Sequence, residues 1–167
     1  MSDQADAAVA DEQKVHRRFG VDLFNGTWTL LEKADRTPDE DALMIHMVHA
    51  SAYHWLQIGE PENFARSHWL CSRVYSVLGR PEPAIYHAKF VLDICQRHGI
   101  GDFDLAYAYE ALARAHAVAG HQAESGQWLA RVRAAAPEIA EEDDRELLIS
   151  DLATIQTIPP PGSVTPG

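Results

Sequence analysis

The chain has 167 residues, and its 14 Lys and Arg against 25 Asp and Glu give a formal net charge of −11. This acidic balance argues against binding to nucleic acid or to an anionic membrane, because both need a basic face. No apolar run reaches the roughly 20 residues of a membrane span, and the acidic N-terminus lacks a signal-peptide pattern, so we expect a cytoplasmic protein.

Local signals predict a series of helices, of which the first two lie upstream of residue 60. A stripe of apolar residues predicts a first helix over about 12–33, although Gly20 and Gly26 weaken it. The sequence TPDE at 37–40 is a capping box with proline at the first helical position, and it predicts a second helix that ends near residue 59.

Proline and glycine mark the later helices in the same way. Pro61 begins a third helix that ends at Gly79, and Pro81 begins a fourth that ends near Gly99. Asp102 is suited to cap the fifth. The remaining signals predict helices over about 102–120, 122–135 and, after the acidic sequence EEDD, 141–155. No segment shows the alternation of a β-strand, so the predicted fold class is all-α.

These signals predict a single helical domain over residues 12–155. Residues 1–11 and the Pro-rich tail, 156–167, are expected to be disordered. Because consecutive helices with short connections pack antiparallel, we expect hairpins. The hairpins would cover about 12–59, 61–99 and 102–136, and a capping helix would cover 141–155.

The helix pairs repeat along the chain. Gly79 and Gly120 each end a helix and lie 41 residues apart, and the same shift superimposes Trp28 on Trp69. The stretch AYAYEALARAHAVAGHQAESGQWLARVRAAAP resembles a tetratricopeptide repeat. The residues that carry the resemblance are Tyr109, Leu112, Ala113, His116 and Gly120 in the first helix, and Ser125, Leu129, Val132 and Pro137 in the second.

The preceding pair matches less completely, and the first pair is degenerate. The period of 41 is also longer than the family's usual length of about 34, which indicates extended helices or an extended loop. The resemblance implies antiparallel hairpins stacked as a right-handed superhelix of about seven helices. The matching residues of the preceding pair are Ser72, Tyr75, Gly79, Ala84, Ala88 and Val91.

The resemblance further implies that one face of the first helix of each pair lines a concave groove. Residues at i, i+3 and i+7 share one side of a helix. Arginine and aromatic side chains are enriched at binding hot spots, and a guanidinium can hold a carboxylate or phosphate through two hydrogen bonds. We therefore predict a binding module for a peptide or a small anionic ligand. The groove residues would be Asn25, Trp28, Glu32, Arg66, Trp69, Arg73, Tyr107, Glu110 and Arg114.

Two alternatives to a ligand-binding groove remain: the groove residues are structural, or the protein is a scaffold that dimerises. Trp28 and Trp69 would pack one repeat on the next, with the arginines paired to Glu32 and Glu110. A dimerising scaffold, and so a homo-oligomer, would use an apolar face of the first or last helix.

The histidine-rich stretch HMVHASAYHW, residues 46–55, raises an enzymatic alternative. His46 and His49 can share a metal, and the 41-residue shift places His46 opposite His87. The alternative is a metal-dependent or small-molecule enzyme in the same groove, with a transition metal as cofactor. Its ligands or acid–base groups would be His46, His49, His87 and Glu110.

Other catalytic patterns are missing from the sequence. It contains no HExxH, no glycine-rich phosphate loop and no GxSxG. Cys71 and Cys95 lie in apolar helical surroundings and are expected to be reduced core thiols, with a disulfide as the alternative. We therefore favour a binding module without a cofactor over an enzyme.

Overall fold

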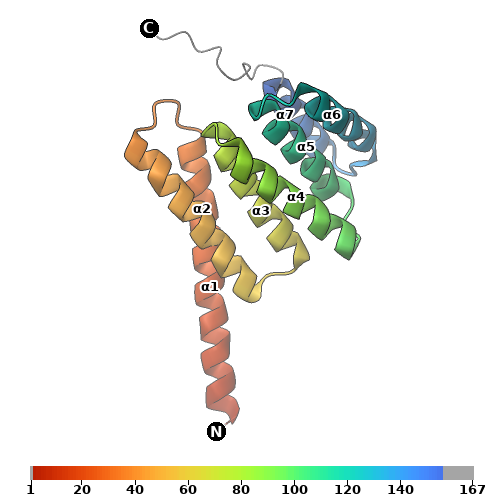
Figure 1. Cartoon of the computed structure of the whole chain (residues 1–167). Coiled ribbons are helices and arrows are strands. Elements are labelled where there is room, and N and C mark those ends of the chain that lie inside the picture. The colour runs from red at the N-terminus through yellow and green to blue at the C-terminus, as the bar shows by residue number, and fades with distance from the viewer. Residues whose placement is uncertain (1, 156–167) are drawn as a thin grey trace.

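The computed structural model describes residues 2–155, with side chains from Val9 onward, and this part of the chain is all-α. Its helices follow one another as antiparallel hairpins (Figure 1). A single 3-10 turn, Ala136–Glu138, follows α6. The seven α-helices within residues 2–155 are α1 (Ser2–Leu31), α2 (Pro38–Ile58), α3 (Pro61–Val77), α4 (Pro81–His98), α5 (Asp102–Val118), α6 (Gln122–Ala135) and α7 (Glu142–Ile155).

The predicted starts of α2, α3 and α4 are confirmed. The Thr37 hydroxyl accepts a hydrogen bond from the Glu40 backbone N–H at 3.3 Å, and the Glu40 carboxylate accepts one from the Thr37 N–H at 2.8 Å. These two bonds form the reciprocal capping box. Pro38, Pro61 and Pro81 begin their helices, where a missing N–H costs no helical hydrogen bond.

The ends of α3 and α5 share the 41-residue register. Gly79 and Gly120 follow these helices with φ of 64° and 75°, a left-handed conformation that favours glycine. After each glycine, the next N–H donates to a carbonyl five residues back, that of Tyr75 or His116, at 2.9 Å in both cases. The two helices therefore end in the same way at equivalent positions.

Equivalent hydrogen bonds also join the two helices of the second and third hairpins. The Ser72 hydroxyl of α3 donates to the Ala84 carbonyl of α4, and the Ser125 hydroxyl of α6 donates to the Ala113 carbonyl of α5, both at 2.9 Å. Serine lies on the first helix in one hairpin and on the second in the other. A shift of 41 residues nevertheless places Ser72 on Ala113 and Ala84 on Ser125. The same two positions are therefore hydrogen-bonded in both hairpins, which repeat one geometry.

The first hairpin departs from this pattern because α1 is longer. α1 has 30 residues, whereas α3 and α5 have 17 each. It begins at Ser2, so the helix covers residues 2–11, which the sequence analysis expected to be disordered. The alanines of that stretch are strong helix formers, which accounts for the difference. The N-terminal part of α1 extends beyond the end of α2 (Figure 1).

The glycines of α1 mark its contact with α2. A Cβ at Gly20 would lie 3.0 Å from the Trp55 ring, and the Ser51 hydroxyl donates to the Gly20 carbonyl at 2.7 Å. A Cβ at Gly26 would meet the end of the Met47 side chain. The small residues let the two helices approach closely, and they do not interrupt α1.

The prediction that Asp102 caps α5 is wrong. α5 has no side-chain cap, and Asp102 itself adopts φ of 52° as its first residue. The Asp102 carboxylate instead accepts a hydrogen bond from the backbone N–H of Ala140 at 3.0 Å. It therefore joins the start of α5 to the segment that leads into α7.

Three further expectations concern chemistry and compartment. Cys71 and Cys95 are buried free thiols, so the alternative of a disulfide is not borne out. No helix within residues 2–155 combines the length and apolar character that crossing a membrane requires. The predicted disordered tail, 156–167, lies outside the described residues.

Candidate functional site

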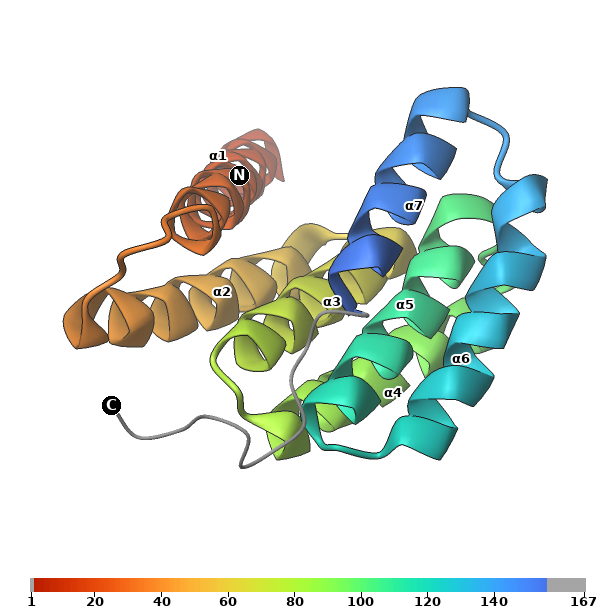
Figure 2. The same cartoon turned by 90° about the horizontal axis from the view of Figure 1, so that it is seen from above.

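An open cleft of about 630 Å³ lies between α1, α3, α5 and α7. Seen from above, α1 and α7 lie on the same side of α3 (Figure 2). Ala65, Arg66 and Trp69 of α3 belong to the lining of the cleft. The predicted groove face of α3 is therefore part of a hollow surface. The lining residues are Phe24, Trp28, Ala65, Arg66, Trp69, Val91, Asp102, Phe103, Asp104, Tyr107, Asp144, Leu147 and Asp151.

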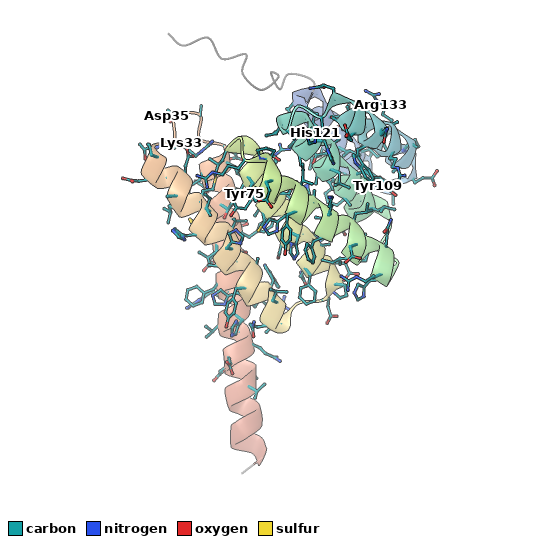
Figure 3. All side chains as sticks on the ribbon, in the orientation of Figure 1. Lys33, Asp35, Tyr75, Tyr109, His121 and Arg133 are labelled. Carbon is teal, nitrogen blue, oxygen red and sulfur yellow. The ribbon has the colours of Figure 1, made fainter. Side chains whose placement is uncertain are left out.

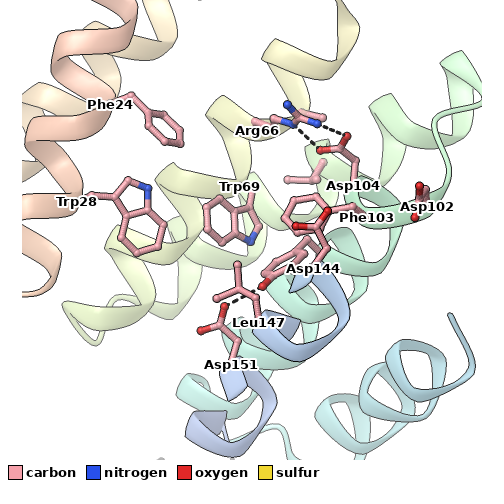
Figure 4. A pocket seen from close by; sticks show the side chains of 13 residues that line it. Phe24, Trp28, Arg66, Trp69, Asp102, Phe103, Asp104, Asp144, Leu147 and Asp151 are labelled. Carbon is pink, nitrogen blue, oxygen red and sulfur yellow. Dashed lines mark hydrogen bonds and ion pairs between the residues drawn. The ribbon is translucent and has the colours of Figure 1, made fainter. Parts of the chain in front are cut away.

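A row of aromatic rings forms the apolar part of the cleft (Figure 4). The centroids of the Trp28 and Trp69 rings are 5.7 Å apart, and Tyr107 meets Trp69 edge-on at 5.4 Å. Phe103 continues the row at 4.5 Å from Tyr107. Leu147 of α7 is 52% exposed across from them, so the cleft offers unburied apolar surface to a ligand.

Arg66 is engaged by a carboxylate at the edge of the cleft. Its guanidinium donates two hydrogen bonds to Asp104 at 2.8 and 2.9 Å (Figure 4). The hydrogen bond to Asp104 raises the pKa of Arg66, so the arginine stays charged and paired. The two donors that the sequence analysis assigned to an anionic ligand already have an anionic partner.

The other two predicted arginines belong to a buried network that attaches α7 to α3 and α5. Arg73 donates to Glu110 at 3.2 Å and to Asp151 at 2.7 Å. Arg114 donates to Glu110 at 2.7 Å and to the Asp151 carbonyl at 3.0 Å. Glu110 is only 1% exposed, so this pairing is what makes its charge tolerable inside the protein.

Tyr107 completes the network on the cleft side. Its hydroxyl donates to the Asp151 carboxylate at 3.1 Å (Figure 4). Burial raises the pKa of Tyr107 far above its usual value, and the Asp151 charge raises it further. The phenol therefore remains a hydrogen-bond donor at neutral pH.

Two polar groups of the lining have no hydrogen bond to any of the residues that the structure describes. The indole N–H of Trp69 is buried and has no acceptor. The Asp144 side chain, in the first turn of α7, has no hydrogen bond or ion pair, although its charge helps to raise the pKa of Arg66. A buried donor without an acceptor costs about 1 to 3 kcal/mol, so a ligand oxygen beside Trp69 would be favoured.

The structure divides the nine predicted groove residues into three groups. Four line the cleft: Trp28, Arg66, Trp69 and Tyr107. Arg73, Glu110 and Arg114 form the adjacent buried network. Asn25 lines a smaller depression beside the cleft, and Glu32 is an exposed residue in the turn that follows α1.

Sequence reasoning missed the contribution of α7. Asp144, Leu147 and Asp151 form one wall of the cleft, although the helix was expected to be only a terminal cap. The acidic start of α7 was assigned to the helix dipole. Its spacing of i, i+3 and i+7 was the available signal, because it places these residues on one side of the helix.

A second cluster of side chains lies on another face of α3. Donor atoms of His49, Cys71 and His87 all lie within 4.8 Å of one another. The Nδ1 atoms of His68 and His87 are 2.9 Å apart, and the His49 Nε2 is 2.8 Å from the Tyr75 hydroxyl. Burial lowers the pKa of His87 to about 4, and His68 and His49 contribute to the shift.

The predicted metal set of His46, His49, His87 and Glu110 is therefore only partly brought together. His49 and His87 meet across α3, but Glu110 is held by Arg73 and Arg114 in the network beside the cleft. Cys71 occupies the place beside the two histidines. It was assigned to the core from its apolar neighbours, although it follows His68 by three residues on the same helix.

Comparison with known proteins identifies no family, since no protein-family model, curated protein or solved structure matches the chain. The established architecture is an all-α one of sequential hairpins within residues 2–155.

Proposed function

We propose that the protein is a peptide-binding module whose ligand enters the cleft between α1, α3, α5 and α7. The observation that carries the proposal is the Trp69 N–H, which is buried without an acceptor, together with the Asp144 carboxylate, which has no hydrogen bond or ion pair. Both lie beside a row of aromatic rings of which Trp28, Trp69 and Phe103 are half-buried. Binding sites commonly combine an apolar lining with a few convergent polar groups.

The scaffold of this module is proposed to be a tetratricopeptide-like superhelix. The support is the matched geometry of the second and third hairpins, whose helix ends and cross-helix serine bonds repeat at 41 residues. Equivalent hairpins that stack by one constant step generate a curved array with a concave surface.

The chemistry of the lining favours an apolar ligand that carries a positive charge. The cleft contains four aspartates and one arginine, and that arginine is paired with Asp104. Asp144 has no hydrogen bond or ion pair, so its charge, which also acts on Arg66, can attract a cation. The faces of Trp28 and Trp69 can hold an ammonium or guanidinium group. A backbone carbonyl of the peptide would accept from the Trp69 N–H.

The same pairing makes a small anion the weaker of the two ligands expected from the sequence. Each of Arg66, Arg73 and Arg114 is already bonded to carboxylates. An anion would have to displace those carboxylates and would also approach Asp144.

An array of nonapeptides tests this proposal. Each peptide has leucine or tryptophan at its centre, and lysine, serine or glutamate at the flanking positions. We expect binding to concentrate on the lysine-flanked members, with a dissociation constant of about 1 to 100 μM for a resynthesised peptide. Fluorescence anisotropy with the labelled peptide then measures the variants.

Asp144→Asn should weaken that peptide about two- to fivefold, as expected for a partly exposed charge pair. Trp28→Ala should weaken it about tenfold through loss of apolar and cation–π contact. Asp143→Asn is the matched control, because Asp143 is exposed next to Asp144 and does not line the cleft. Preference for glutamate-flanked peptides, or equal effects of Asp143→Asn and Asp144→Asn, would contradict the proposal.

A further inference from the structure

Three elements bring metal-ligating groups together on the side of α3 away from the cleft. His49 comes from α2, Cys71 from α3 and His87 from α4. Because a helix turns about 100° per residue, Cys71 lies roughly 170° around α3 from the centre of the Arg66–Trp69–Arg73 stripe. The cluster is therefore separate from the proposed peptide site and does not depend on it.

The spacing of the three donors suits a small ion. Their donor atoms all lie within 4.8 Å of one another. In a tetrahedral zinc site with bonds of about 2.0 to 2.3 Å, ligand atoms are roughly 3.4 to 3.8 Å apart, so closing this cluster needs shifts of about 1 Å. Side-chain rotation of the exposed His49 can supply much of that movement.

The donor types select a class of metal. One thiolate and two imidazoles suit Zn²⁺, whereas Mg²⁺ and Ca²⁺ prefer oxygen ligands. Burial raises the pKa of the Cys71 thiol to about 12, so the metal must displace the thiol proton as it binds. The buried side of the cluster holds sulfur, and the exposed side leaves a fourth position for water.

Neighbouring side chains are placed to orient the two imidazoles. His68 shares a hydrogen bond with His87 through the Nδ1 atoms at 2.9 Å, and Tyr75 bonds His49 Nε2 at 2.8 Å. Each imidazole has two nitrogens, so one can bind the metal while the other keeps its partner. Metal-bound histidines generally have such a second hydrogen bond. Figure 3 labels Tyr75, which lies at this part of the molecule.

We propose that His49, Cys71 and His87 form a mononuclear Zn²⁺ site, with His68 and Tyr75 as positioning residues for the two histidine ligands. The site joins α2, α3 and α4, so the ion would link the first hairpin to the second. Three protein ligands leave one coordination position for water or an external ligand.

The test uses the full chain without an affinity tag, stripped with EDTA and titrated with Zn²⁺ or Co²⁺. We expect one equivalent of metal and, with Co²⁺, the charge-transfer absorption that a cobalt–thiolate bond produces. Cys71→Ser should abolish that absorption, and Cys95→Ser, which alters a buried thiol outside the cluster, should leave it intact.

His49→Gln tests a ligand whose replacement leaves the fold intact, because His49 is exposed. The affinity of this variant for Zn²⁺ should fall more than about tenfold, since replacing even a residue that only orients a metal ligand lowers metal affinity by about that factor. His46→Gln, an exposed histidine on the same helix, should bind like the wild type. Less than a tenth of an equivalent of bound metal would overturn the proposal. So would cobalt binding without charge-transfer absorption, or absorption that survives Cys71→Ser.

Discussion

Two faces of α3 carry different chemistry. The face with Arg66, Trp69 and Arg73 contains charged groups, and its arginines are neutralised by carboxylates from α5 and α7. The face with His68 and Cys71 contains uncharged donors that contact α2 and α4. Helical periodicity alone therefore keeps a charged site and a neutral site apart on one helix. Each site can therefore be altered without the other.

The largest expected effect on stability comes from removing the buried carboxylate that pairs with the arginines of the charged face. Glu110→Ala leaves Arg73 and Arg114 without their shared buried carboxylate, whose side chain is 1% exposed. We expect the free energy of unfolding to fall by about 3 to 5 kcal/mol, as for other buried ion pairs that lose one member. Urea denaturation followed by circular dichroism measures the change.

An exposed ion pair supplies the control for this measurement. Asp93 and Arg97 are 2.7 Å apart on α4, with side chains 55% and 57% exposed. Asp93→Ala should cost less than about 0.5 kcal/mol, because water screens the pair. Equal losses for Glu110→Ala and Asp93→Ala would show that the network beside the cleft contributes no more than a surface contact.

In the metal-free protein, protonation of His87 on the neutral face should make the folding stability depend on pH. Burial lowers the pKa of His87 to about 4 in the folded chain, whereas the unfolded chain titrates near 6.5. Below pH 6.5 the unfolded chain binds more protons, so stability falls as the pH drops from 6.5 towards 4. Between pH 7 and pH 5 we expect His87 to account for a loss of about 1 to 2 kcal/mol, allowing for its partial exposure.

Urea denaturation at pH 7 and pH 5, with EDTA present, measures this loss. His87→Gln cannot take up the proton, so its stability should change less between the two pH values than that of the wild type. If both proteins lost the same free energy, the burial of the His87 ring would not be the cause.

The smallest expected effects are the cross-effects between the two faces. Asp144→Asn should change the Zn²⁺ affinity by less than about twofold, and His49→Gln should change the peptide affinity by less than about twofold, because distant sites behave independently. Isothermal titration of both ligands against both variants checks this. A large cross-effect would mean that the two sites are coupled through α3.

The local part of the fold was predictable from the sequence. The capping box of Thr37 and Glu40, the prolines that begin helices and the glycines after α3 and α5 act through neighbouring residues. Such signals need no knowledge of tertiary structure. Gly20 shows the limit, because its role depends on the Trp55 ring of another helix, which the local pattern does not reveal.

The candidate sites were predictable only in part, for the same reason. The 41-residue shift brought Trp28, Trp69 and Tyr107 to one wall, where their rings do meet. The alternative in which Glu110 pairs with the arginines is confirmed for Arg73 and Arg114. The other two partners were not predictable, since Asp104 and Asp151 approach from α5 and α7 across long stretches of chain. Their pairing shifts the favoured ligand from an anion to a cation.

The Trp69 indole N–H gives the most direct test of the central claim that this cleft binds a ligand. Its resonance in a nitrogen–proton correlation spectrum, assigned with Trp69→Phe, is followed while the lysine-flanked peptide is added. We predict a downfield shift as the N–H gains an acceptor, whereas the indole of Trp128, packed on Tyr109 away from the cleft, should not move. A Trp69 resonance that stays in place at saturating peptide would contradict the account.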